Sequence, residues 1–272
     1  MSNSDQIELI RKLAKKMRKS LLEISLNCGE AAHIGGGLSI VDIMATLYGS
    51  VLNLNLKNPV DRFILSKGHG FLGLLSALHC VGYIKKDEAM KFQTNGSELI
   101  AHPIMNPEIG IESSNGSLGQ GLSYATGLAI AYKKKKKKGS IFTLVGDGEC
   151  YEGSIWEAAI TATETNLENL VLIVDCNGFE NDGAISDKMN FNELISKWNG
   201  FGWNTISCDG HNISELLTSL NKRAINKPTA IIAKTIKGKG VPFMENNNDW
   251  HHGRLTKNLY LTAINDLEKN HA

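Results

Sequence analysis

Residues 141–177 read IFTLVGDGECYEGSIWEAAITATETNLENLVLIVDCN, and this stretch decides the fold class. The apolar runs at 141–145 and 170–175 are typical of buried strands, and the residues between them have the spacing of a helix. A strand, a helix and a second strand in this order favour two parallel strands. If the strands are neighbours, Asp147 and Asn177, which follow them, lie at the same edge of the sheet.

The alternation of helices and strands continues on both sides of this stretch. Helices are predicted at about 119–137, 153–165, 190–198 and 213–223, and strands at 62–66, 203–208 and 229–234. This order predicts an α/β fold, a doubly wound parallel sheet flanked by helices. No proline-rich linker or change of composition marks a boundary, so we expect a single domain over residues 1–272.

The N-terminal part is expected to be helical with one interruption. Apolar residues recur at helical spacing over about 4–27. The glycine-rich segment 29–37 is predicted to break this helix, and a second helix is expected from 39 to about 52. The strand at 62–66 then ends in the glycine turn KGHG, which opens a further helix.

Composition excludes several classes of protein. The chain has 29 Lys plus Arg against 28 Asp plus Glu, a formal net charge of +1, and five cysteines without a CxxC pair. The near-zero net charge gives no overall positive potential that would attract nucleic acid. The cysteine pattern does not indicate a disulfide framework and is typical of a reducing compartment. The polar N-terminus lacks a signal-peptide core, and the apolar stretches are too short to span a bilayer. We expect a cytoplasmic protein that binds neither nucleic acid nor membrane.

Asp147 and Asn177 are candidate ligands for a hard cation. A carboxylate and an amide oxygen suit magnesium or calcium, which often completes its shell with phosphate oxygens. Gly146 and Gly148 would let the backbone approach a phosphate closely. GDG and Asn-Gly are also common turns, so each motif alone has a purely structural explanation. The combination leaves both interpretations open at this point.

The same stretch resembles the thiamine diphosphate motif, which begins with GDG and ends in Asn-Asn roughly thirty residues later. Here the final pair is Cys176-Asn177. Further segments resemble the N-terminal half of transketolase in the family's order: AHIGGGLSIVDIMATLY, DRFILSKGHGFLGLLSALHCVGY, GIESSNGSLGQGLSYATGLAIA and AKTIKGKGVPFMENNNDWHHGRL. The length resembles that of the first chain of split transketolases.

The resemblance implies roles for individual residues. Magnesium ligands would be Asp147, Asn177 and the main-chain carbonyl of Phe179. Residues of the cofactor site would be His69, Gly116, Leu118, Gly148, Glu152, Asn177 and His252. Of these, Glu152, with Glu157, falls where transketolases place acidic residues at the contact between active sites.

Four histidines resemble those that line the route to the cofactor in transketolases and are candidates for proton transfer: His33, His69, His102 and His252. His251 competes with His252 for the last position, and the pairing with Gly253 favours His252. The remaining histidines, His79, His211 and His271, are taken as structural or exposed.

The resemblance implies transfer of a two-carbon ketol unit between sugars or sugar phosphates, with thiamine diphosphate and magnesium as cofactors. It also implies a companion chain, because the glutamate that activates the cofactor belongs to a pyrimidine-binding domain not expected within these 272 residues. The expected assembly is a heterotetramer. Two alternatives stay open. The chain could be part of another thiamine diphosphate enzyme, either the alpha chain of a 2-oxo acid decarboxylase or dehydrogenase or a relative of deoxyxylulose phosphate synthase. It could also be a non-catalytic chain that binds the cofactor.

Overall fold

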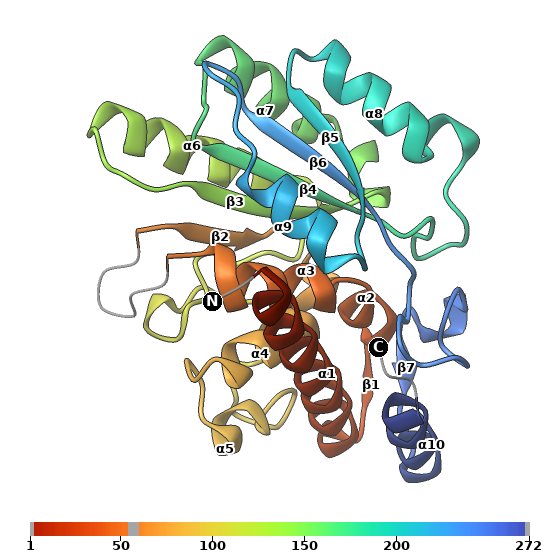
Figure 1. Ribbon diagram of the computed structural model, residues 1–272. Coiled ribbons are helices and arrows are strands. Elements are labelled where there is room, and N and C mark those ends of the chain that lie inside the picture. Colours follow the sequence, from red (N-terminus) through yellow and green to blue (C-terminus); the bar gives the residue numbers. More distant parts are fainter. Residues whose placement is uncertain (1–2, 54–59, 270–272) are drawn as a thin grey trace.

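Five parallel strands form the central sheet of the computed structural model, which describes residues 3–53 and 60–269 (Figure 1). In spatial order they are β2 (Arg62–Leu65), β3 (Ile141–Gly146), β4 (Leu170–Cys176), β6 (Thr229–Lys234) and β5 (Asn204–Asp209). All neighbouring pairs are parallel. The predicted strands and the predicted α/β fold are therefore confirmed, and β3 and β4 are neighbours.

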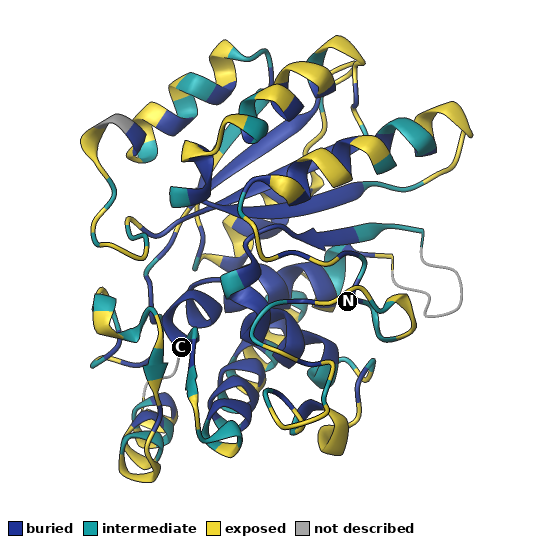
Figure 2. Ribbon diagram, turned by 180° about the vertical axis from the view of Figure 1, so that it is seen from behind, coloured by how far each residue is buried: buried dark blue, intermediate teal, exposed yellow. Residues whose placement is uncertain are grey.

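Helices cover both faces of this sheet, as Figure 1 shows. One face carries α6 (Gln120–Lys134), α7 (Gly153–Glu164) and α8 (Phe191–Gly200), and the other carries α1 (Asn3–Cys28), α3 (Val41–Thr46), α4 (Phe71–Cys80) and α9 (Ile213–Asn221). Successive strand side chains alternate between the two cores: Phe142 and Leu144 join one, and Ile141 and Val145 join the other. The central strands are accordingly buried, while the helices expose their outer sides (Figure 2).

The predicted break at residues 29–37 was wrong in its second half. The first helix ends at Cys28 as expected, but α2 (Ile34–Ser39) already contains the three consecutive glycines. They serve close packing: a Cβ on Gly37 would lie 3.2 Å from the backbone N of Gly73 in α4. The helix predicted from 39 to about 52 is made up of α3 (Val41–Thr46) and a π-helical turn at Leu47–Val51.

A small second sheet joins two segments that are far apart in the sequence. Strand β1 (Ala31–Ala32) pairs antiparallel with β7 (Gly253–Arg254). This pairing places His33 next to the segment that carries His251 and His252. The short α5 (Lys86–Ala89) and the C-terminal α10 (Lys257–Lys269) lie at the periphery (Figure 1). His271 lies outside the described residues.

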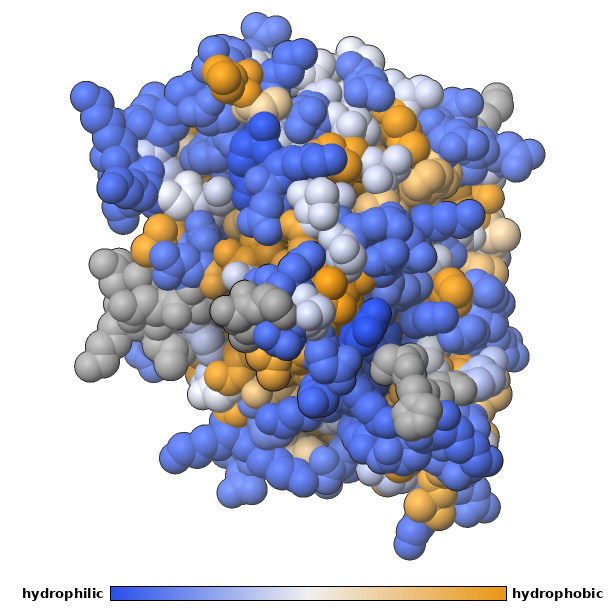
Figure 3. Space-filling view, viewed as in Figure 1, coloured by the Kyte–Doolittle hydropathy of each residue, from blue (hydrophilic) through white to orange (hydrophobic). Residues whose placement is uncertain are grey.

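The surface is mostly hydrophilic on the face drawn in Figure 3, and apolar residues form separate patches between polar ones. Within residues 3–53 and 60–269, no helix has the length and apolar character that crossing a membrane requires.

Candidate active site

A cavity lies at the carboxyl end of the sheet, where three neighbouring strands end. Asp147 follows β3, Asn177 follows β4, and Lys237 comes shortly after β6. Since these strands are adjacent, their ends bring the three side chains to one place. The cavity is lined by His33, Gly36, Lys67, His69, Leu118, Gly146, Asp147, Gly148, Glu149, Asn177, Phe179, Glu180, Asn181, Asp182, Lys237 and His251.

Asp147 is a buried carboxylate held by two backbone N–H groups. Gly148 N donates to Oδ1 at 2.9 Å, and Gly178 N donates to Oδ2 at 2.6 Å. Gly178 has a φ of +80°, which favours glycine, and the turn directs its N–H to Asp147. Burial and the charge of Asp175 raise the pKa of Asp147 to about 6. A divalent cation beside the carboxylate would offset both effects.

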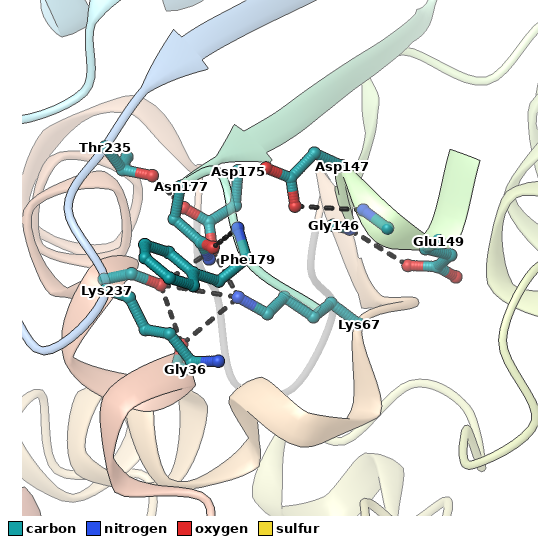
Figure 4. Close-up of polar contacts among 12 residues, drawn as sticks. Gly36, Lys67, Gly146, Asp147, Glu149, Asp175, Asn177, Phe179, Thr235 and Lys237 are labelled. Carbon is teal, nitrogen blue, oxygen red and sulfur yellow. Dashed lines mark hydrogen bonds and ion pairs between the residues drawn. The ribbon is translucent and has the colours of Figure 1, made fainter. Parts of the chain in front are cut away.

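Asp175, in β4, is fully buried beneath the cavity and connects its walls (Figure 4). The Ser39 hydroxyl donates to it at 2.7 Å, and the Thr235 hydroxyl also donates. Lys67 forms an ion pair with the same carboxylate. Burial alone would raise the pKa of Asp175, but the charge and hydrogen bond of Lys67, aided by the hydroxyls, hold it below its usual range. Asp175 is therefore a buried anion.

The network fixes the amide of Asn177. Its Nδ2 donates to Asp175 Oδ2 at 3.0 Å, and its Oδ1 accepts from Phe179 N at 3.0 Å. An amide oxygen has two lone pairs, so Oδ1 can also bind a cation. Asn177 is thus oriented for the role that the sequence predicts.

Glu149 ties three segments together around the cavity. Its Oε1 accepts from the Ser66 hydroxyl at 2.5 Å and from Gly119 N at 2.9 Å, and its Oε2 accepts from Gly146 N at 3.1 Å. Burial raises the pKa of Glu149, although these hydrogen bonds oppose the shift. The contacts join the ends of β2 and β3 to the start of α6.

Lys237 places a buried ammonium group in the cavity. Its Nζ donates to Asn248 Oδ1 at 2.6 Å and lies 2.8 Å from His251 Nδ1. Burial and the charge of Lys67 lower the pKa of Lys237 to about 8, so the group is mostly protonated at pH 7. Since Lys67 is paired with Asp175, the ammonium of Lys237 is the cavity cation that can meet an anionic ligand.

Five histidine rings cluster at the cavity: His33, His69 and His251 line it, whereas His102 and His252 lie outside its lining and contact the ring of His33. The ring centroid of His33 lies 4.6 Å from that of His69 and 4.7 Å from that of His252. It lies 5.5 Å from the centroids of both His102 and His251. Burial, followed by the neighbouring rings, lowers the pKa of His33 to about 3 and that of His69 to about 4. Burial and Lys237 lower the pKa of His251 to about 3, and burial also lowers that of His102. The imidazoles with lowered pKa values are therefore neutral at pH 7.

The late histidine pair is arranged differently from the expectation. His251 is half-buried and lines the cavity, whereas His252 is exposed and reaches the cluster through its contact with the ring of His33. The pairing with Gly253 favoured His252 over His251, and the pattern gave no information on which ring faces inward. The catalytic role of His252 stays a prediction.

Other predicted residues divide into two groups. Leu118, Gly148 and Phe179 line the cavity. Gly116 and Glu152 do not line it: both are exposed, Gly116 in the loop before α6 and Glu152 at the N-terminus of α7. Their roles in cofactor binding stay predictions.

Sequence reasoning missed four charged residues of the site: Lys67, Glu149, Asp175 and Lys237. Each stands within or shortly after a predicted strand and inside a segment quoted for the resemblance. The rule that ligands bind beyond the carboxyl ends of parallel strands could have pointed to Lys67, Glu149 and Lys237, whereas Asp175 lies within β4.

The comparisons with known proteins agree with this geometry. Residues 10–263 match the family model described as transketolase, thiamine diphosphate binding domain. The chain is 38% identical to the 6-deoxy-6-sulfo-D-fructose transketolase subunit of Clostridium sp. (strain MSTE9), over 98% of each chain. The chain belongs to the transketolase family. It is also 39% identical to an apulose-4-phosphate transketolase subunit of Actinobacillus succinogenes, over 89% of this chain and 90% of that one.

Among solved structures, the transketolase of Campylobacter jejuni superposes with a TM-score of 0.86 and 26% identity. The match covers 96% of this chain and 43% of that transketolase, so the chain spans less than half of that enzyme. Because it matches the separate subunits over nearly their whole length, the chain corresponds to the N-terminal subunit of a two-chain transketolase.

The cavity residues fit the cofactor of this family. One carboxylate, one amide oxygen and one main-chain carbonyl, from Asp147, Asn177 and Phe179, are the oxygen ligands that magnesium prefers. Gly148 lines the cavity beside them and packs closely on Glu180, since a Cβ there would lie 3.0 Å from the Cβ of that side chain. With the ammonium of Lys237 nearby, this arrangement fits a diphosphate held through a metal ion.

Proposed function

We propose that this chain binds thiamine diphosphate with Mg²⁺ and, with a companion chain, transfers a two-carbon ketol unit from a ketose or ketose phosphate to an aldose. The observation that carries the proposal is one cavity that contains Asp147, Asn177 and a cluster of neutral histidines. Bound thiamine diphosphate supplies the electron sink that this reaction needs. The chain's own residues bind, orient and move protons.

Different residues of the cavity hold the metal ion and the diphosphate. Asp147, Asn177 and the carbonyl of Phe179 hold the Mg²⁺, and Gly148 and Lys237 contact the diphosphate. This assignment is supported by the fixed amide of Asn177 and by the burial of Lys237. Leu118 and Gly116 lie against the cofactor rings, and Glu152 contributes where two active sites meet.

The histidines act on the sugar. His69 and His252 accept and return protons at the reacting oxygens, and His33 and His102 bind hydroxyl groups nearer the entrance. A neutral imidazole both donates and accepts, as polyol recognition requires. A bound diphosphate would add negative charge near His33 and His69 and so would raise their lowered pKa values, which favours proton acceptance by these rings.

The companion chain carries the pyrimidine-binding domain, and two copies of each chain form a twofold heterotetramer in the cytoplasm. Names of the relatives support a companion, since the Clostridium and Actinobacillus proteins are both named as transketolase subunits. Their names also give the first donors to test: 6-deoxy-6-sulfo-D-fructose and apulose 4-phosphate.

Ketol transfer by the purified complex tests the proposal. The assay follows transfer from each donor to an aldose phosphate, with saturating thiamine diphosphate and Mg²⁺, for this chain alone, the companion alone and both together. We expect turnover only when both are present. A complex that binds the cofactor without turnover would support the non-catalytic alternative, and release of carbon dioxide from pyruvate would support a 2-oxo acid enzyme.

A further inference from the structure

A cluster of three charged or titratable side chains lies outside the lining of the cavity. Arg18 of α1 and Asp42 of α3 form a two-pronged ion pair, with nitrogen–oxygen distances of 3.0 and 2.5 Å. His211, in the turn between β5 and α9, adds its Nδ1 at 2.7 Å from Asp42 Oδ2. We call this group the Arg18–Asp42–His211 cluster. Burial would raise the pKa of Asp42, but Arg18 and His211 together lower it to about 2, so Asp42 is an anion.

The second ring nitrogen of His211 binds the main chain. Ile236 N donates to His211 Nε2 at 2.9 Å. A backbone N–H can only donate, so Nε2 is the unprotonated nitrogen. Nδ1 therefore carries the ring proton and donates a hydrogen bond to Asp42. The ring thus connects a buried carboxylate to the amide of Ile236.

The cluster also holds the other end of the same short segment. Arg18 Nε donates to the carbonyl oxygen of Lys239 at 3.2 Å. Residues 236–239 are therefore held at the N–H of the first residue and the carbonyl of the last. Lys237, the residue whose ammonium enters the cavity and contacts His251, lies between these two points.

Close packing of the turn against this segment reinforces the connection. Gly210 N donates to the carbonyl of Lys234 at 2.8 Å, and a Cβ on Gly210 would lie 2.4 Å from Cγ2 of Thr235. Only glycine allows the turn to approach so closely, and this approach brings the ring of His211 to Ile236.

We propose that His211 is a positioning residue, which with Asp42 and Arg18 fixes the backbone of residues 236–239 so that Lys237 presents its ammonium to the cofactor. The inference rests on the proposed function of the cavity. A buried ion pair contributes little net stability compared with apolar packing, so the cluster's main effect is geometric. Other bonds also restrain the segment, including Gly238 N to the carbonyl of Gly35 at 3.0 Å, but His211 provides the contact at its amino end.

Two conservative variants separate the contacts of His211. In His211→Asn, the amide takes the place of Nδ1 and keeps the bond to Asp42 but cannot reach Ile236. In His211→Gln, the amide oxygen takes the place of Nε2 and accepts from Ile236. Thiamine diphosphate is titrated calorimetrically, with Mg²⁺, into the assembled complex of each variant. We expect His211→Asn to bind thiamine diphosphate about tenfold or more weakly than the wild type. We expect His211→Gln to bind it within about threefold of the wild type.

A double-mutant cycle tests whether the effect passes through Lys237. If it does, His211→Asn weakens binding much less in a Lys237→Met background than alone. Equal losses in the two backgrounds, or equal affinities for Asn and Gln, would overturn the proposal. Equal losses of thermal stability in both variants with unchanged affinity would also overturn it, because that pattern indicates a purely structural role.

Hydrogen exchange of residues 235–239 without cofactor gives an independent readout. We expect faster exchange in His211→Asn than in His211→Gln, and equal exchange would contradict the inference. If the wild-type complex binds no thiamine diphosphate, the proposed function fails, while the exchange experiment still decides whether His211 holds the segment.

Discussion

Replacement of Lys67 by methionine should destabilise the chain strongly, because it leaves Asp175 as an uncompensated buried anion. Asp175 is 0% exposed, and the side chain of Lys67 is 9% exposed. The variant removes the positive partner but keeps the Ser39 hydroxyl, the Thr235 hydroxyl and the Asn177 amide as donors. Methionine preserves most of the side-chain volume, so the change is mainly electrostatic.

The magnitude follows from the burial of the pair. Breaking a buried ion pair by removing one partner costs roughly 3–5 kcal/mol. For a chain of this size, this corresponds to a fall in Tm of about 10 °C. Urea unfolding followed by circular dichroism measures the loss, and Lys91→Met serves as the control because the Lys91–Glu88 pair is exposed, so its loss should change stability little.

A double variant isolates the charge effect. Adding Asp175→Asn to Lys67→Met removes the unpaired anion, so it should recover part of the lost stability. A Lys67→Met chain within about 1 kcal/mol of the wild type, matching Lys91→Met, would refute the view of Asp175 as a buried anion held by Lys67.

Three further predictions concern the metal ligand, the catalytic groups and pH. Asn177→Ala should weaken Mg²⁺-dependent binding of thiamine diphosphate, measured by calorimetry in the complex, and equal affinity would remove Asn177 from the metal site. His69→Ala and His252→Ala should each lower kcat by about 10² to 10⁴, more than they weaken cofactor binding, in a steady-state assay. A variant with wild-type kcat returns that histidine to a structural role. Folding holds the pKa of His33 at about 3, against 6.5 for a free imidazole, so the unfolded chain binds more protons between these values. The free energy of unfolding should therefore fall as pH is lowered from 6.5 toward 3. In denaturant titrations, the free energy of unfolding of His33→Asn should fall less steeply with pH than that of the wild type. Identical pH dependence of the two would contradict a neutral, buried His33.

Much of the fold could be predicted because buried parallel strands are short, continuous apolar runs that end in glycine turns. The runs ending at Gly146 and Cys176 needed no information beyond their own residues. The position of β6 between β4 and β5 could not be read in this way, since the order of strands depends on which helix crosses which face. The glycines of α2 looked like a break because glycine lowers helix propensity, and only the tertiary structure reveals the close approaches of Gly35 to Trp250 and of Gly37 to α4.

The candidate site was predictable where it follows from strand ends and not where it depends on pairing across the fold. Asp147 and Asn177 followed from topology. The Lys67–Asp175 ion pair joins residues 108 positions apart, and local periodicity carries no information on such a contact. The choice between His251 and His252 depends on the backbone path before β7, which a sequence pattern does not specify.

Asp147 is proposed to hold thiamine diphosphate through Mg²⁺, and calorimetric titration of the assembled complex is the decisive measurement. The wild-type complex is predicted to bind thiamine diphosphate only with Mg²⁺ present. Asp147→Ala should abolish this dependence together with most of the affinity, because it removes the only charged metal ligand of the proposed set. An Asp147→Ala complex that binds the cofactor with unchanged affinity and the same requirement for Mg²⁺ would contradict the account.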